Sequence, residues 1–102
     1  MSVVVTLRFE GVHSWPGCPH DDVAFLRHPH RHVFHITAKK PVTHDDRDVE
    51  IIRLKRAMEA HLTGYAMEQG SCEMLARHLA AVFGLSYCMV LEDGENGAEL
   101  IA

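Results

Sequence analysis

Histidine is the residue type whose number and spacing stand out in this chain. Nine of the 102 residues are histidines, and His30 and His32 form an H-x-H triplet. Two side chains at positions i and i+2 of a strand lie on one face, about 7 Å apart at the backbone. That separation allows two imidazoles to bind one metal ion at about 2.0–2.1 Å per nitrogen. Because a chain this rich in histidine is expected to contain such a triplet by chance, the triplet needs support from its surroundings.

The residues around the triplet supply that support. Residues 2–12 alternate as a half-buried strand does, with one face formed by Val3, Val5, Leu7, Phe9 and Gly11. His13 continues this face, and in a second predicted strand, about 31–39, His30 and His32 share the face of Phe34, Ile36 and Ala38. If the two strands pair antiparallel, all three imidazoles project from the same end and face of the sheet.

This arrangement predicts a zinc site formed by His13, His30 and His32. Three histidines with an open fourth position are typical of catalytic zinc, where water or substrate completes the coordination shell. The alternative is that these residues are ordinary surface or core histidines, as we expect for His61 and His78. Burying three imidazoles without partners on an apolar face is costly, which favours the metal site for this trio.

The remaining pattern predicts two helices. Residues 45–48 provide capping and first-turn acids for a helix whose buried stripe would be Ile51, Leu54, Met58 and Leu62, with Gly64 as its terminator. Ser71 would cap a second helix that ends at Gly84. Its buried stripe would comprise Leu75, His78 or Leu79, and Val82.

Two further strands are predicted at 86–91 and 98–102, joined by a glycine-rich turn over 93–97. A long loop, 14–29, separates the first two strands. The order is therefore ββααββ, which predicts a single α+β domain over residues 1–102. In this fold two helices would cover one face of a four-stranded antiparallel sheet.

Composition excludes some function classes. The net charge of −4 and the scattered basic residues disfavour a nucleic-acid-binding protein. No stretch reaches the roughly 18–20 apolar residues of a membrane helix, and the N-terminus lacks the features of a signal peptide. The three cysteines, Cys18, Cys72 and Cys88, are widely spaced and odd in number, which is typical of reduced thiols in the cytoplasm.

Several segments together resemble the family of 6-pyruvoyl- and 6-carboxy-tetrahydropterin synthases, which has the tunnelling fold. Residues 9–13 (FEGVH) resemble the family's F-x-A-A-H, and residues 30–34 (HRHVF) resemble its H-G-H-x-Y/F. Residues 50–55 (EIIRLK) are similar to D-F-x-x-L-K, and residues 71–76 (SCEMLA) are similar to P-T-S-E-N-L-A. Residues 90–93 (VLED) match V-x-E-T. The segments occur in the family's order and span nearly the whole chain.

The resemblance implies roles for these residues. His13, His30 and His32 would be the zinc ligands, and Glu92 would anchor the ring of a pterin or deazapurine-like small molecule through its N–H groups. Without the resemblance, Glu92 would be a solvated residue at a turn. The family also implies a homo-oligomer, with a hexamer as the first expectation. In such an assembly the sheets would join around a tunnel, and the site would be completed between subunits.

Two family features are missing here. The family's catalytic cysteine lies four residues before H-x-H, where this chain has Leu26, and the Asp-His pair between the helices has no counterpart in residues 62–70. Cys18, in the long loop, is a candidate replacement for the catalytic thiol, and so is a carboxylate among Asp45, Asp46 and Asp48. We therefore expect a zinc protein with altered or lost synthase chemistry. The alternatives are a binding module that does not turn its ligand over, and a structural oligomer with a zinc-stabilised loop.

Overall fold

The computed structural model describes all 102 residues and confirms the α+β fold with the predicted ββααββ order. One additional short 3-10 helix, η1, lies in the loop between the first two strands. The elements in chain order are β1 (Ser2–His13), η1 (Asp21–Arg27), β2 (His30–Pro41), α1 (Ile51–Leu62), α2 (Cys72–Phe83), β3 (Tyr87–Glu92) and β4 (Asn96–Ile101). No helix is both long and apolar enough to cross a membrane.

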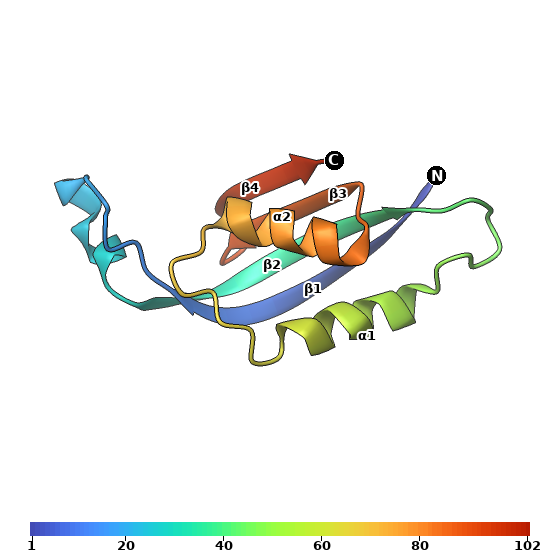
Figure 1. The fold of residues 1–102 in the computed structure, drawn as a ribbon, viewed down its shortest axis with the longest axis horizontal. Helices are drawn as coiled ribbons and strands as arrows, with labels where there is room; N and C mark the ends of the chain where they lie inside the picture. Colours follow the sequence, from blue (N-terminus) through green and yellow to red (C-terminus); the bar gives the residue numbers. More distant parts are fainter.

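The four strands form one antiparallel sheet in the order β1-β2-β3-β4. β1 and β2 are twelve residues each and pair along their full length, so that His13 lies directly opposite His30. The loop that joins them, with η1, extends beyond the end of the sheet (Figure 1). This hairpin therefore places the last residue of β1 beside the first residues of β2, as the alternation predicts.

Both helices cover the same face of the sheet (Figure 1). α1 packs mainly on β1, and α2 packs on β3 and β4. The inward residues of the strands and the apolar stripes of both helices form one core, and Phe34, Ile36, Met58, Leu75, Leu79 and Val90 are its most deeply buried large side chains. The face of the sheet that carries the three histidines is therefore the core face.

The predicted start of the first helix was wrong. α1 begins at Ile51, and its cap is Glu50, whose carboxylate accepts a hydrogen bond of 2.7 Å from the Arg53 backbone N–H. Asp48 does not cap the helix because its carboxylate accepts from the backbone N–H and the hydroxyl of Thr43, at 2.8 and 3.0 Å. Residues 45–48 thus belong to the loop before α1.

The other helix boundaries agree with their predicted signals. Gly64 follows the end of α1 with φ of 75°, and Gly84 ends α2 in the left-handed conformation with φ of 63°. The Ser71 side chain caps α2 by accepting from the Met74 N–H at 3.1 Å. The predicted burial of two residues was wrong. Ile51, in the first turn of α1, is 49% exposed, and Val82, at the margin of the α2 stripe, is 48% exposed.

The last hairpin is tighter than predicted. β3 extends through Glu92 and β4 begins at Asn96, so the turn comprises residues 93–95. Asp93 and Gly94 both have positive φ, 55° and 74°, which reverses the chain within these few residues. Glu92 is therefore a strand residue, and it lies opposite Phe34 of β2 on the core face of the sheet.

Candidate metal centre

Three imidazoles meet at one end of the sheet. His13 ends β1, His30 begins β2, and His32 lies two residues further along β2 on the same face. The centroid of the His13 ring is 4.5 Å from that of His30 and 5.4 Å from that of His32, and the last two centroids are 5.0 Å apart. The structure thus brings together the three residues that the strand pattern selected.

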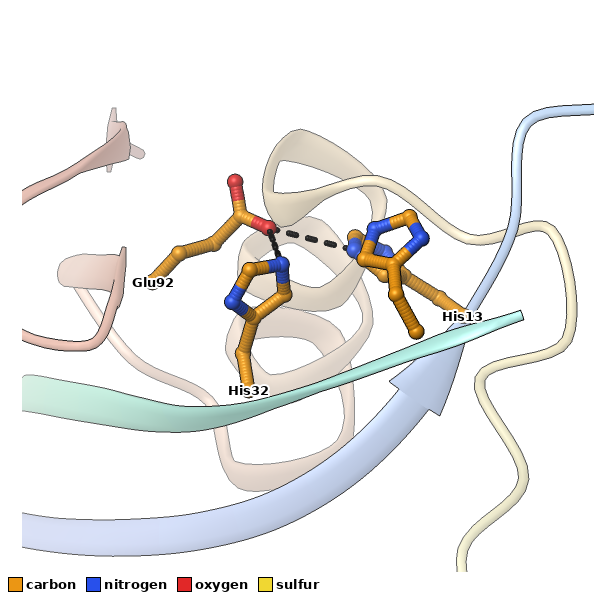
Figure 2. A group of neighbouring side chains, drawn as sticks. His13, His32 and Glu92 are labelled. Carbon is orange, nitrogen blue, oxygen red and sulfur yellow. Dashed lines mark hydrogen bonds and ion pairs between the residues drawn. The ribbon is translucent and has the colours of Figure 1, made fainter. Parts of the chain in front are cut away.

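A carboxylate joins them from the neighbouring strand. The Oε2 atom of Glu92 lies 3.1 Å from Nε2 of His13 and 2.8 Å from Nε2 of His32 (Figure 2). One donor atom from each of His13, His30, His32 and Glu92 lies within 4.8 Å of all the others. These four residues, which we call the His3Glu cluster, could hold a metal ion.

The outer nitrogen of every histidine in the cluster is already engaged. Nδ1 of His13 lies 2.8 Å from the carbonyl oxygen of Gly70, and Nδ1 of His30 lies 2.8 Å from that of His28. Carbonyl oxygens only accept hydrogen bonds, so both Nδ1 atoms must donate. In the neutral imidazole the lone pair is then on Nε2, which faces the centre of the cluster. This orientation by an outer partner is typical of metal-binding histidines.

The outer partner of His32 is a carboxylate that the sequence reasoning missed. Nδ1 of His32 donates to Oδ2 of Asp93 at 2.7 Å, and the other Asp93 oxygen accepts from the Val33 backbone N–H at 3.0 Å. Consecutive strand residues point to opposite faces, but the positive φ of Asp93 ends the strand and lets Glu92 and Asp93 both contact His32. The hydrogen bond from His32 lowers the pKa of the Asp93 carboxyl, so this group stays ionised at neutral pH.

The inner nitrogens are the atoms that need a partner. Nε2 of His30 and Nε2 of His32 are buried and make no hydrogen bond within the chain. Oε2 of Glu92 lies close to Nε2 of His32, but the contact is outside hydrogen-bond geometry. Leaving a buried polar atom unsatisfied costs about 1–3 kcal/mol. A metal ion bound by the Nε2 atoms satisfies them all at once, so the residues present fit a metal.

A cavity of about 590 Å³ opens beside the cluster. Its wall includes His13, His30, Glu92 and the first turn of α2, and Trp15 and Leu26 contribute from the long loop. Cys72 also lines it, but burial, with the nearby charges of Glu92 and Glu73, raises the pKa of this thiol to about 11. The raised pKa favours the thiol form of Cys72 over the nucleophilic thiolate.

Cys18 and the predicted carboxylates lie apart from the cluster. Cys18 is buried within the loop between β1 and β2, where its thiol donates to the carbonyl oxygen of His20 at 3.7 Å, and it does not line the cavity. Asp45, Asp46 and Asp48 lie in the loop before α1. The structure brings none of these residues into the site, and a catalytic role for Cys18 stays a prediction.

A second histidine pair lies between the helices. Nε2 of His61, in α1, and Nε2 of His78, in α2, are 2.8 Å apart, and the Tyr65 ring stacks on His78 with centroids 5.1 Å apart. The two imidazoles hydrogen-bond to each other through these atoms, so neither has an unpartnered buried nitrogen like Nε2 of His30 and Nε2 of His32. Only that cluster combines convergent nitrogens, a carboxylate and a cavity.

Neither a protein-family model nor a curated protein matches this sequence. The resemblance to the tetrahydropterin synthases therefore depends on the motifs themselves. What the structure adds is the position of their residues: the three histidines and the glutamate of the matching segments lie in one cluster.

Proposed function

We propose that this chain is a zinc-binding protein whose metal centre is formed by His13, His30 and His32. The observation that carries the proposal is the directionality of the three imidazoles. Each Nδ1 donates to a fixed outer acceptor, so each Nε2 presents its lone pair to the same centre. Three imidazole donors and one carboxylate suit zinc, whereas magnesium prefers sites made only of oxygen ligands.

We further propose that the cavity beside the centre binds a pterin or a deazapurine-like small molecule. A volume of about 590 Å³ is in the range of small-molecule sites. Glu92 lies on its wall, and a carboxylate can accept two parallel N–H bonds from the guanidine-like edge of such a ring. The family resemblance supports the same ligand class. A bound zinc would supply polarisation of a ligand side chain placed against it.

The groups around the cavity favour binding over synthase chemistry. Leu26, at the position of the family's catalytic cysteine, lines the cavity and has no proton to transfer. The loop between the helices, which has no Asp-His pair, contributes the Gly70 carbonyl that orients His13. Burial raises the pKa of the Cys72 thiol, which favours its protonated form. We therefore propose altered or lost synthase activity, with the chain's own residues holding the ring and orienting the metal ligands.

One observation favours a second candidate function, a structural zinc site. Glu92 offers a fourth donor from the same chain, and a shell of four protein ligands is typical of structural zinc. In that case the metal would hold the ends of β1, β2 and β3 together and the cavity would have no specific ligand. Ligand binding distinguishes the two candidates.

The test is calorimetric titration of pterin into the zinc-saturated protein and two variants. Glu92→Gln should lose pterin binding while three histidines still retain the zinc, because the amide cannot accept both ring N–H groups as the carboxylate does. Glu95→Gln removes the same charge from an exposed residue of the neighbouring turn and should bind as the wild type does. No pterin binding to the wild type would leave the structural site as the better account, and equal pterin affinity in both variants would exclude Glu92 as the ring anchor.

A further inference from the structure

The position of Glu92 within the cluster has a consequence for how the metal centre opens. Tetrahedral zinc with ligands at about 2.0–2.1 Å holds its donor atoms about 3.3 Å from one another. Oε2 of Glu92 already lies 3.1 and 2.8 Å from two of the histidine nitrogens. The carboxylate therefore occupies the place of a fourth ligand, where a three-histidine centre would hold water or substrate.

The hydrogen-bond pattern agrees with this position. Nδ1 of His13 and Nδ1 of His32 already donate outward, so a neutral ring faces Glu92 with the Nε2 lone pair, which repels a carboxylate. The 3.1 Å hydrogen bond between Nε2 of His13 and Oε2 of Glu92 needs a second proton on that ring. Such a contact is stable only if the rings carry a second proton or if nitrogen and oxygen share a cation. A divalent metal satisfies both sides and removes the repulsion.

Glu92 uses only one of its oxygens in this contact. Figure 2 shows Oε2 directed at the histidines and the other oxygen directed away from them. The same side chain lies on the wall of the cavity and is 30% exposed, so the carboxylate borders space into which it can turn. One carboxylate thus reaches both the metal position and the space where a ligand would lie.

We propose that Glu92 is a displaceable fourth ligand that closes the metal centre until a ligand in the cavity draws the carboxylate away. This inference rests on the proposed three-histidine centre and concerns its regulation. The resting centre has no open position, and a small anion binds the metal only when Glu92 leaves. Glu92 then has two alternative states. In one it is the fourth metal ligand, and in the other it anchors a ring in the cavity and leaves the fourth position open.

The experiment uses Co²⁺ as a spectroscopic substitute for zinc and azide as the probe. In the wild type we expect a four-coordinate visible spectrum that azide changes only at high concentration. In Glu92→Ala the fourth position is open, and azide should bind at least about tenfold more tightly, a difference of about 1.4 kcal/mol. Glu92→Gln, which keeps the shape of the side chain, should fall between the two, and Glu95→Ala should match the wild type.

The outcomes separate this inference from the proposed function. Equal azide affinity and equal spectra in the wild type and Glu92→Ala would overturn the fourth-ligand role, while the three-histidine centre would stand. Failure of the folded wild type to bind Co²⁺ at all would overturn the metal centre itself. Circular dichroism of each variant establishes that it is folded before the comparison is made.

Discussion

At the scale of single residues, the site depends on what lies behind each histidine of the His3Glu cluster. The three histidines differ in their outer partners: His13 and His30 donate to backbone carbonyls, and His32 donates to the Asp93 carboxylate. A carboxylate partner raises the basicity of the ligand more than a neutral carbonyl does, and it fixes the ring in the productive tautomer. His32 is thus the proposed ligand whose orientation is held by a side chain, so a substitution at Asp93 can test it.

Asp93→Asn should weaken zinc binding about 10- to 100-fold, the usual effect of losing an outer partner of a metal ligand. The amide keeps the size of the side chain but removes the charge that supports His32. Competition with a chromophoric chelator measures the affinity. Asp45→Asn, at an exposed position in the loop before α1, is the matched control and should bind zinc as the wild type does. An Asp93→Asn affinity within twofold of the control would exclude this role for Asp93.

Residue types and spacing selected the three histidines, whereas Glu92 came only from the family resemblance, and as a ring anchor instead of a neighbour of the metal ligands. The H-x-H triplet and the alternation that ends at His13 select the histidines, and the V-x-E-T resemblance selects Glu92. Asp93 was missed because its role depends on a left-handed backbone that turns two consecutive carboxylates toward one imidazole. Sequence spacing carries no sign of that contact, although the Asp-Gly pair at residues 93 and 94 does indicate a turn.

At the scale of elements, the hairpin of β3 and β4 holds Glu92 and Asp93 in place. β3 ends at Glu92, and Gly97 of β4 lies opposite Leu91. A Cβ atom on Gly97 would lie 1.8 Å from the carbonyl oxygen of Val90, a backbone atom that cannot move aside without breaking the pairing. Gly97 is therefore required for the two strands to approach.

Gly97→Ala should destabilise the fold by about 3 kcal/mol or more, because the clash is with backbone and not with a flexible side chain. Urea unfolding followed by circular dichroism measures the loss. Gly17→Ala is the control, since nothing lies within 4 Å of the added Cβ there, and its stability should stay close to that of the wild type. If the two variants unfold at the same urea concentration, the close approach of β3 and β4 is incorrect.

The elements were more predictable than their ends. Alternation over residues 2–12 and the capping signals at Ser71 and Gly84 depend on local chemistry, and these predictions were confirmed. The start of α1 was wrong because Thr43 competes for the carboxylate of Asp48, a contact with no helical spacing. The prediction for Val82 was wrong because the buried stripe of α2 also includes the smaller residues Cys72, Ala76 and Ala80 beside Leu75 and Leu79, which leaves Val82 at its margin.

At the scale of the whole molecule, the sheet has two open edges, β1 and β4. β1 is twelve residues long, and a strand edge of that length is a template for pairing with another chain. Its solvent-facing residues include Val4 and Val12, both about half exposed, and Ile101 at the end of β4 is 75% exposed. These features favour association, as the family resemblance also implies.

We expect a homo-oligomer, with a hexamer as the first expectation. Sedimentation velocity over a range of protein concentrations measures the assembly. A charged substitution on the β1 edge, Val4→Lys, should shift the distribution toward smaller species, whereas Ala57→Lys on the exposed side of α1 should not. A species of 11.5 kDa that persists at every concentration would contradict association through this sheet.

The metal content of the protein tests the central claim most directly. Elemental analysis after zinc loading and gel filtration should find about one Zn²⁺ per chain in the wild type. His32→Ala should retain far less, because it loses one of the three imidazole ligands and only two histidines and a carboxylate remain. His35→Ala removes a histidine from the opposite face of the same strand and should keep the wild-type content. A wild type that retains no zinc, or a His32→Ala protein that retains as much as His35→Ala, would contradict the account.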